Sequence, residues 1–424
     1  MGEPASSPPD SAEAAIVSVA RLSYGRLVAY LAARSGDIAA AEDALSDAFA
    51  TALRRWPADG VPHKPEAWLL HAARNRLTDA VRHEMVRRKV EPLLQVAAAA
   101  ESAATADSPF PDERLKLLFV CAHPAIDPAA RTPLMLQAVL GLSAARIASA
   151  FLVSPAAMDQ RLVRAKTKIR ETRIAFRVPE PPEWDERASF VLDAIYSAYT
   201  AGWEDAADEN ATHHALASEA VALGRTVVEL LPHEPEARGL LALMLHCEAR
   251  RPARLRPVDD GNGASAPTFV PLDRQDPAHW SPTLIAEAES HLRAASAAQR
   301  LGRYQLEAAI QSVHAHRAIS GTIDWPQIAL LYEGLVRLAP TIGAHVGRAV
   351  ALGECGQPAQ GIAALDALPP PRAAAYQPWW AARAHLLRQL GRAADARNAF
   401  ERAASLSDDP VLRTHLLAQA AALA

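Results

Sequence analysis

Residues 141–173, GLSAARIASAFLVSPAAMDQRLVRAKTKIRETR, decide the fold of the N-terminal half of the chain. Their apolar residues recur at helical spacing on both sides of a short break, as in two helices joined by a tight turn. Ser143 and Ser154 stand where the helices would begin, each with a side-chain oxygen that can accept an unpaired backbone N–H. Pro155 falls at the first position of the second helix, where its missing N–H costs nothing. The apolar residues that would pack the first helix are Leu142, Ile147, Ala148, Phe151 and Val153.

The second helix of this stretch has two contrasting faces. Its apolar face consists of Met158, Leu162, Ala165 and Ile169. Its other face carries Arg161, Arg164, Lys166, Lys168, Arg170 and Arg173. An apolar back and a basic front directly after a tight turn are typical of a recognition helix in the DNA major groove. The alternative is a basic amphipathic helix in an ordinary all-helical protein.

Length and composition limit the class of protein. A chain of 424 residues predicts two or three domains. Half of the residues are apolar, yet no apolar run approaches the roughly 20 residues that cross a bilayer. The N-terminus, MGEPASSPPDSAEAA, lacks the basic start and apolar stretch of a secretion signal. Cys121, Cys247 and Cys355 are too far apart for a metal site or a disulfide framework. We therefore expect a soluble protein of the cytoplasm.

Charge is divided unevenly along the chain. The net charge of −4 is the sum of +4 over residues 1–177 and −8 over residues 178–424, and all five lysines lie in the first part. Two segments hold the positive charge: His71–Val90 has six basic residues against two acidic ones, and Arg146–Arg177 has eight against two. Positive charge concentrated on two separate helices suits a phosphate backbone. The acidic remainder is not expected to contact nucleic acid.

Breaks in helical periodicity divide the chain into sections. We expect a disordered tail at 1–11, a helical unit at 12–90, an Ala-rich linker at 91–111, a second helical unit at 112–177 and a helical extension at 185–424. One interruption at 251–283 is rich in Pro, Gly, Asp and Asn. No extended strand pattern is visible, so the sequence predicts an all-α fold.

The end of the chain shows internal repetition. Within 377–410, packing residues fall where a tetratricopeptide repeat places them: Trp380, Ala384, Leu387, Gly391, Ala396, Phe400 and Ala403. A weaker copy precedes it, at Ala349, Leu352, Gly356, Gly361 and Leu365. Because each repeat needs stacked neighbours for stability, we expect several irregular helix pairs between 185 and 424. The alternative is a helical bundle without true repeats.

Taken together, the helix-turn-helix and the first helical unit resemble a bacterial RNA polymerase sigma factor of the extracytoplasmic-function type. That family joins a domain 2 to a domain 4 through a flexible linker. Residues Ala39–Trp56 resemble the region 2.2 helix that docks on the clamp of the largest polymerase subunit. Residues Pro65–Lys89 resemble regions 2.3 and 2.4, which melt and recognise the −10 element.

The extension resembles one subgroup of these sigma factors, which carries a tetratricopeptide-like C-terminal extension. The residues that carry this resemblance are GVP at Gly60–Pro62 and the fragments EPEARGLLALML, LDRQDPAHW, GRYQLEAAIQSVHA and IDWPQIALLYEGL. The resemblance covers nearly the whole chain and is specific when its parts are combined.

The resemblance implies promoter recognition by binding and strand separation, without catalytic residues, metal or cofactor. For core polymerase it implies Glu42, Asp43, Asp47 and Phe49, where carboxylates border an apolar stripe that could bind a partner helix. For the −10 element it implies Arg74, Asn75, Arg76, Arg82, Arg87 and Arg88. For the −35 element it implies Ser154, Gln160, Arg161, Arg164 and Lys168. The acidic extension is expected to regulate, by covering the basic surfaces or by docking a partner protein.

Some positions depart from the family. Ser46 stands where many members have Gln, and Arg146 replaces a usual acidic residue. Asp159, on the recognition helix, would repel phosphate but could accept a hydrogen bond from cytosine. The loop Asp259–Gly263 is only loosely similar to the subgroup.

Several alternatives stay open. The acidic residues around Glu42 could be the solvated face of a core helix, and Trp68 could be a core residue and not a platform for an unpaired base. The whole protein could be a stand-alone helix-turn-helix regulator with a partner-sensing repeat domain. The sequence shows no P-loop, dinucleotide-binding fingerprint, zinc-ligand spacing or nucleophile elbow, so it does not support an enzyme. A pure scaffold leaves the concentrated basic charge unexplained.

Overall fold

The computed structural model describes residues 9–88, 113–151, 153–180, 183–204, 211–259 and 265–423. It is all-α apart from one small hairpin, which confirms the predicted fold class. The chain divides into two units, Met1–Ala201 and Gly202–Ala424. The helices of the first unit are α1 (Pro9–Ser35), α2 (Ile38–Asp59), α3 (Pro65–Arg88), α5 (Arg114–Cys121), α6 (Pro128–Ala138), α7 (Ala144–Ala150), α8 (Pro155–Thr172) and most of α9 (Trp184–Glu204).

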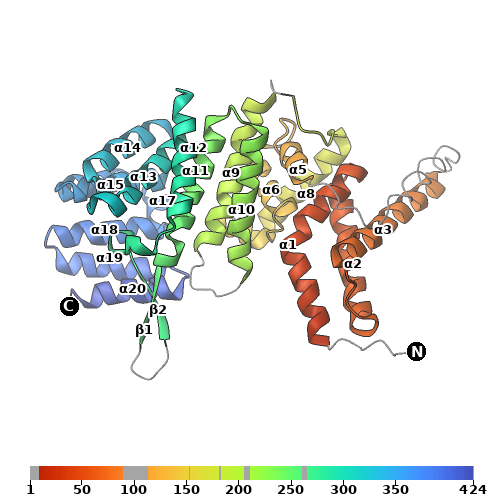
Figure 1. Ribbon diagram of the computed structural model, residues 1–424, viewed down its shortest axis with the longest axis horizontal. Coiled ribbons are helices and arrows are strands. Elements are labelled where there is room, and N and C mark those ends of the chain that lie inside the picture. The colour runs from red at the N-terminus through yellow and green to blue at the C-terminus, as the bar shows by residue number, and fades with distance from the viewer. Residues whose placement is uncertain are drawn as a thin grey trace. The chain divides into compact units, whose positions relative to one another are not determined.

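Helices α1, α2 and α3 pack on one another and form the first core (Figure 1). Their largest buried side chains include Leu27, Leu45, Trp56 and Leu69, each at most 1% exposed. Glu66 in the first turn of α3 accepts hydrogen bonds from Ser23 Oγ and, at 2.8 Å, from Arg26 Nη2, both on α1. These bonds fix the start of α3 against α1.

Helices α5 to α8 form the second group of the first unit, and α7 and α8 are the predicted helix-turn-helix. Ser154 Oγ accepts from the backbone N–H of Ala157 at 3.3 Å, and Ser143 Oγ from that of Arg146 at 3.3 Å, so both predicted N-caps are confirmed. Buried Arg131 on α6 donates to the carbonyls of Ile126 and Pro124. These bonds hold the turn before α6.

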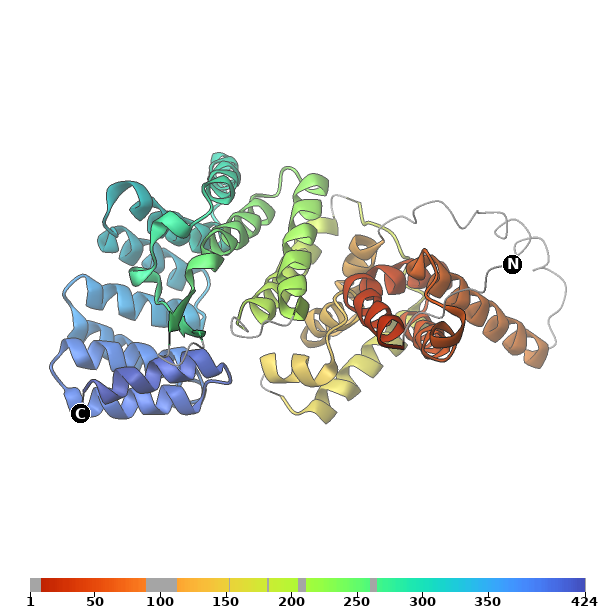
Figure 2. The ribbon, with the colours of Figure 1, turned by 60° about the horizontal axis from the view of Figure 1, so that its bottom comes forward.

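The second unit is built from successive packed helices, visible from α11 to α20 in Figure 2. Its helices are α10 (Ala211–Leu230), α11 (Pro235–Arg250), α12 (Pro282–Ala297), α13 (Arg303–Ser320), α14 (Trp325–Leu338), α15 (Ile342–Glu354), α16 (Pro358–Asp366), α17 (Pro370–Ala374), α18 (Gln377–Gln389), α19 (Ala393–Ser405) and α20 (Pro410–Ala421), with the 3-10 turns η2 (Arg251–Ala253), η3 (Leu272–Arg274) and η4 (Pro277–His279).

A carboxylate joins α11 to α13. Glu236 accepts hydrogen bonds from the backbone N–H groups of Tyr304 and Gln305 at 2.9 and 3.1 Å, at the first turn of α13. Gly239 permits this approach, because a Cβ there would lie 2.7 Å from the backbone nitrogen of Gln305. The negative charge faces the positive end of the helix dipole.

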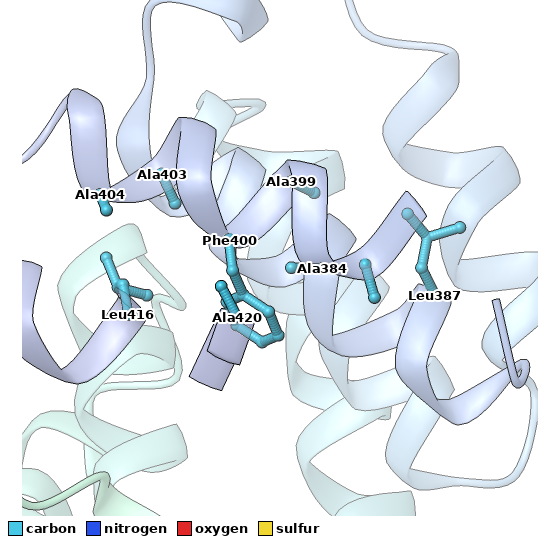
Figure 3. Close-up of a cluster of buried hydrophobic side chains, with 9 residues drawn as sticks. Ala384, Leu387, Ala399, Phe400, Ala403, Ala404, Leu416 and Ala420 are labelled. Atoms are coloured by element: carbon cyan, nitrogen blue, oxygen red, sulfur yellow. The ribbon is translucent and has the colours of Figure 1, made fainter. Parts of the chain in front are cut away.

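The C-terminal helices bury the residues that the repeat pattern singled out (Figure 3). Ala384, Leu387, Ala396, Phe400 and Ala403 lie in one cluster with Leu416 and Ala420 of α20, and Trp380 packs against it. Gly391 follows α18 with φ of 76°, a conformation that favours glycine, so the predicted helix end is confirmed. In the weaker copy, Gly356 plays the same part after α15 with φ of 81°.

The prediction of no strands was wrong at one place. Strands β1 (Leu255–Asp259) and β2 (Ser265–Phe269) form an antiparallel hairpin inside the Pro-rich interruption, with Pro257 opposite Pro267. Proline disrupts the usual strand pattern because it lacks the N–H that a central strand needs. In a two-stranded hairpin both strands are edges, so the prolines are tolerated.

No single helix in the described parts of the chain is long and apolar enough to cross a membrane. Two segments of α1, Ala12–Ala20 and Leu22–Ser35, satisfy the length and composition criteria only as a pair bent by 60°. Leu27, Val28 and Leu31 in the second segment are fully buried in the protein core.

Candidate nucleic-acid interface

Helix α3 presents the first group of predicted DNA contacts. Its inner face carries buried Leu69, Leu70 and Ala73, which leaves Asn75 and Arg76 exposed on the other side. Asn75 Nδ2 lies 3.2 Å from His71 Nε2 one turn earlier, and Arg76 Nε lies 4.0 Å from Asp47 Oδ2 on α2. Arg74 is half-buried. The backbone of α3 includes Arg82, Arg87 and Arg88, but their side chains lie outside the described residues.

Trp68 lies on the side of α3 that faces the core of the first unit. Its ring centroid lies 5.5 Å from that of Trp56 in an edge-to-face arrangement, and Trp56 is 1% exposed. This geometry favours the core interpretation of Trp68 over a free stacking platform.

Helix α8 presents the second group. Its buried side consists of the four residues predicted for it, Met158, Leu162, Ala165 and Ile169. Gln160, Arg164 and Lys168 are exposed, and Arg164 Nε donates to the carbonyl of Gln160 at 3.3 Å. Ser154 is exposed but is already used as the N-cap.

Arg161 and Val163 differ from the sequence expectation. Arg161 is half-buried, and its Nη1 donates to the carbonyl of Ala129 on α6 at 3.3 Å, so this side chain ties α8 to its own domain. Val163, which the prediction passed over, is 62% exposed between Gln160 and Lys168 on the outer side of the helix. The sequence does show that Val163 is an apolar residue outside the buried face of this basic helix, and this could have marked it as a candidate contact.

Helix α2 carries the predicted polymerase-binding residues. Asp43 and Asp47 are exposed, whereas Glu42 and Phe49 are half-buried. Leu45 and Leu53 lie four residues before and after Phe49 and continue its apolar stripe along α2. Leu45 is fully buried in the core, whereas Leu53 is 52% exposed, so a partner could reach Leu53 but not Leu45.

The structure brings α2 and α8 together, which the sequence did not predict. Lys166 Nζ on α8 forms an ion pair with Glu42 Oε2 on α2, and each side chain is 14% exposed. Burial raises the pKa of Glu42, and the ammonium of Lys166 opposes that shift. Further along, Arg170 Nη1 lies 4.0 Å from Asp37 Oδ2 at the N-cap of α2.

Helix α1 also contacts the second group of helices through its backbone. A Cβ built at Gly25 would lie 1.7 Å from the carbonyl oxygen of Val139, directly after α6. One at Gly141 would lie 3.2 Å from the ring of Tyr24. Only glycine at position 25 allows this approach of the two backbones.

The exposed basic residues of α8 in the helix-turn-helix, with Asn75 and Arg76 exposed on α3, are typical of a DNA-binding protein. Residues 20–86 match the family described as Sigma-70 region 2, and residues 116–169 match Sigma-70, region 4. The chain belongs to the sigma-70 family of RNA polymerase sigma factors, which bind core polymerase and take part in promoter recognition. Residues 187–296 match a family of unknown function, DUF6596.

A relative extends the similarity over almost the full length. An uncharacterized protein of Rhizobium meliloti (strain 1021) is 37% identical over 399 residues, which cover 93% of this chain and 91% of the relative. The sequence similarity to that protein therefore spans both sigma-70 regions and most of the extension. No solved structure matches the chain.

Proposed function

We propose that this protein is a sigma factor of the extracytoplasmic-function type with a tetratricopeptide-like extension. It binds core polymerase in the cytoplasm, directs it to promoters with −10 and −35 elements, and is released after initiation. The observation that carries the proposal is the presence of regions 2 and 4 on one chain, each with exposed basic residues on a helix.

Each domain has its own task in this proposal. Domain 2, at 12–90, holds the opened strand at the −10 element, with Asn75 at a base edge and arginines on phosphates. Domain 4, at 112–177, binds the −35 duplex, and the 91–111 linker joins the two. Val163 adds an apolar contact suited to a thymine methyl group. Neither domain needs tight binding alone, because polymerase tethers both to one promoter.

The polymerase contact is assigned to helix α2, including the position where Glu42 pairs with Lys166 of α8. Glu42, Asp43 and Asp47 provide carboxylates, while Phe49 and Leu53 provide apolar surface. An apolar stripe bordered by carboxylates suits docking against a partner helix.

The extension, at 185–424, is assigned a regulatory role through a partner protein. Its last helices, α18 to α20, bury several alanines around Phe400, a pattern typical of tetratricopeptide-like repeats, and its charge balance is acidic. Such stacked pairs commonly expose a surface for protein partners.

Co-purification with core polymerase tests the central proposal. We expect the full chain to bind core polymerase and to support run-off transcription from genomic promoter fragments. Asp43→Lys with Asp47→Lys should abolish both, because it reverses two exposed charges. Asp59→Lys, at the far end of α2 and also exposed, is the matched control and should retain both activities. Tight operator binding by the isolated protein, without polymerase association, would instead establish a stand-alone regulator.

Truncation tests the role of the extension. The chain ended at residue 184 removes all of it, whereas the chain ended at residue 201 keeps the part of α9 that clusters with the first unit. Arg131 stacks on Phe190 of α9 at 4.5 Å, so the longer product preserves a contact that the shorter one loses. Transcription unchanged in both products would rule out an essential regulatory role.

A further inference from the structure

Arg131 on α6 is a buried arginine that is held by neutral groups. Its side chain donates from Nε to the carbonyl of Ile126 at 3.0 Å and from Nη2 to the carbonyl of Pro124 at 3.2 Å. Its guanidinium carbon also lies 4.5 Å from the ring centroid of Phe190 on α9. Arg131 is 4% exposed, and a buried charge is costly unless neighbouring groups stabilise it. The face of an aromatic ring is such a group, so Phe190 helps to hold this guanidinium and the turn that it fixes.

The turn that Arg131 fixes also supports the recognition helix. It ends at the start of α6, where Asp127 caps the helix by accepting a hydrogen bond from the backbone N–H of Ala129 at 2.9 Å. The carbonyl of Ala129 accepts a hydrogen bond from Arg161 Nη1 on α8 at 3.3 Å. Arg161 lies in the second turn of α8, three residues before the exposed Arg164. The position of α8 within its domain therefore depends on a carbonyl two residues before Arg131.

Phe190 belongs to the extension by sequence and to the first unit by structure. The match to DUF6596 begins at residue 187, whereas the first unit continues to Ala201. Phe190 lies in this overlap, and the partner of its ring, Arg131, lies within the match to Sigma-70, region 4, at 116–169. Helix α9 is therefore a place where the extension contacts the DNA-binding domain directly.

We propose that Phe190 is a positioning residue for recognition of the −35 element. It acts through Arg131 and the turn before α6 on the bond between Arg161 and Ala129, and so on the orientation of α8. This inference rests on the proposed function, because it requires that α8 binds the −35 duplex. The extension thereby affects promoter affinity without contacting DNA itself. A series of contacts carries such an effect only if its members are energetically coupled, so the test measures coupling.

Binding of the holoenzyme to a promoter fragment, and to the same fragment with a scrambled −35 element, tests the proposal in the full-length chain. Phe190→Ala should weaken binding to the intact fragment about threefold to tenfold and leave binding to the scrambled fragment unchanged. Phe190→Tyr keeps the aromatic face and should retain the natural affinity. Ser189→Ala, at an exposed neighbouring position on α9, is the matched control and should also retain it.

A second background tests the role of Arg161. In Arg161→Ala, the further change Phe190→Ala should cause no additional loss, because the proposed effect ends at the Arg161 side chain. Three results would overturn the inference alone: natural affinity of Phe190→Ala for the intact fragment, an equal loss on both fragments, and the same fold-loss in both backgrounds. Wild-type holoenzyme that binds the two fragments equally would instead overturn the proposed function, and this inference with it.

Discussion

At the scale of the residue, the exposed side of α8 separates two kinds of DNA contact. Arg164 is positioned by its bond to the carbonyl of Gln160, whereas Lys168 is exposed one turn later. We expect Arg164→Ala to cost about 1–3 kcal/mol on the preferred −35 element and to relax preference at one base pair. Lys168→Ala should weaken binding to all promoters alike and reduce the salt slope by about one.

Binding of the holoenzyme to promoters with single −35 substitutions, measured over a range of salt, distinguishes the two roles. An Arg164→Ala variant that loses affinity equally on every substituted promoter would contradict base recognition by this side chain.

His314 gives a second prediction at this scale, for the pH dependence of stability. Burial, followed by the charges of Arg250 and Arg317, lowers its pKa to about 4 in the folded state from about 6.5 for a free histidine, so the unfolded state binds the proton more readily. The contribution of neutral His314 to the free energy of unfolding is therefore complete above pH 6.5 and is lost as the pH falls toward 4. The difference corresponds to about 3 kcal/mol.

Urea unfolding at pH 7 and pH 4.5 measures this effect. His314→Gln should reduce the pH dependence of the unfolding free energy more than His316→Gln, a control position exposed on the same helix. Equal slopes in all three proteins would refute the assignment.

At the scale of the element, the helix pair α18–α19 and helix α20 depend on one aromatic side chain. Phe400 is 5% exposed among Ala384, Leu387 and Ala420 (Figure 3). Phe400→Ala should lower the free energy of unfolding by about 3–5 kcal/mol, since it removes apolar contacts and leaves a cavity. Leu417→Ala on α20, where the side chain is 48% exposed, is the control and should cost less than 1 kcal/mol. Denaturant unfolding compares them, and similar losses would disprove the central role of Phe400.

The sequence predicted local structure well because local structure depends on near neighbours. Caps at Ser143 and Ser154, the buried face of α8 and the helix end at Gly391 all follow from side chains within a few residues. The hairpin of β1 and β2 escaped prediction because its prolines disrupt the usual strand pattern. Arg161 also escaped, since its carbonyl partner at Ala129 lies 32 residues away.

At the scale of the whole molecule, the helix proposed to bind polymerase, α2, contacts the helix proposed to recognise DNA, α8. Glu42, assigned to polymerase, is paired with Lys166 of the recognition helix, 124 residues away. No local pattern in the sequence predicts such a pair, although both charges are visible in it. If polymerase needs the side of α2 that includes Glu42, docking must break this ion pair.

We therefore expect Lys166→Met to bind core polymerase up to about tenfold more tightly, because it raises the population of the binding-competent state. Methionine has a side chain of similar length to lysine but carries no charge. Lys168→Met, exposed on the same helix, should leave the affinity unchanged. Fluorescence anisotropy with labelled protein gives both values. Unchanged or weaker binding of Lys166→Met would mean that the pair does not compete with polymerase.

The closeness of Gly25 to Val139 has a practical consequence. One added methyl group at position 25 would collide with the backbone at Val139 and push α1 away from the end of α6, without changing any side chain assigned to promoter or polymerase. Gly25→Ala thus offers a way to separate helices α1 to α3 from helices α5 to α8 while the side chains proposed to bind DNA and polymerase stay unchanged. A sigma factor whose two promoter-binding regions are separated would thus differ from the natural protein by a single carbon atom.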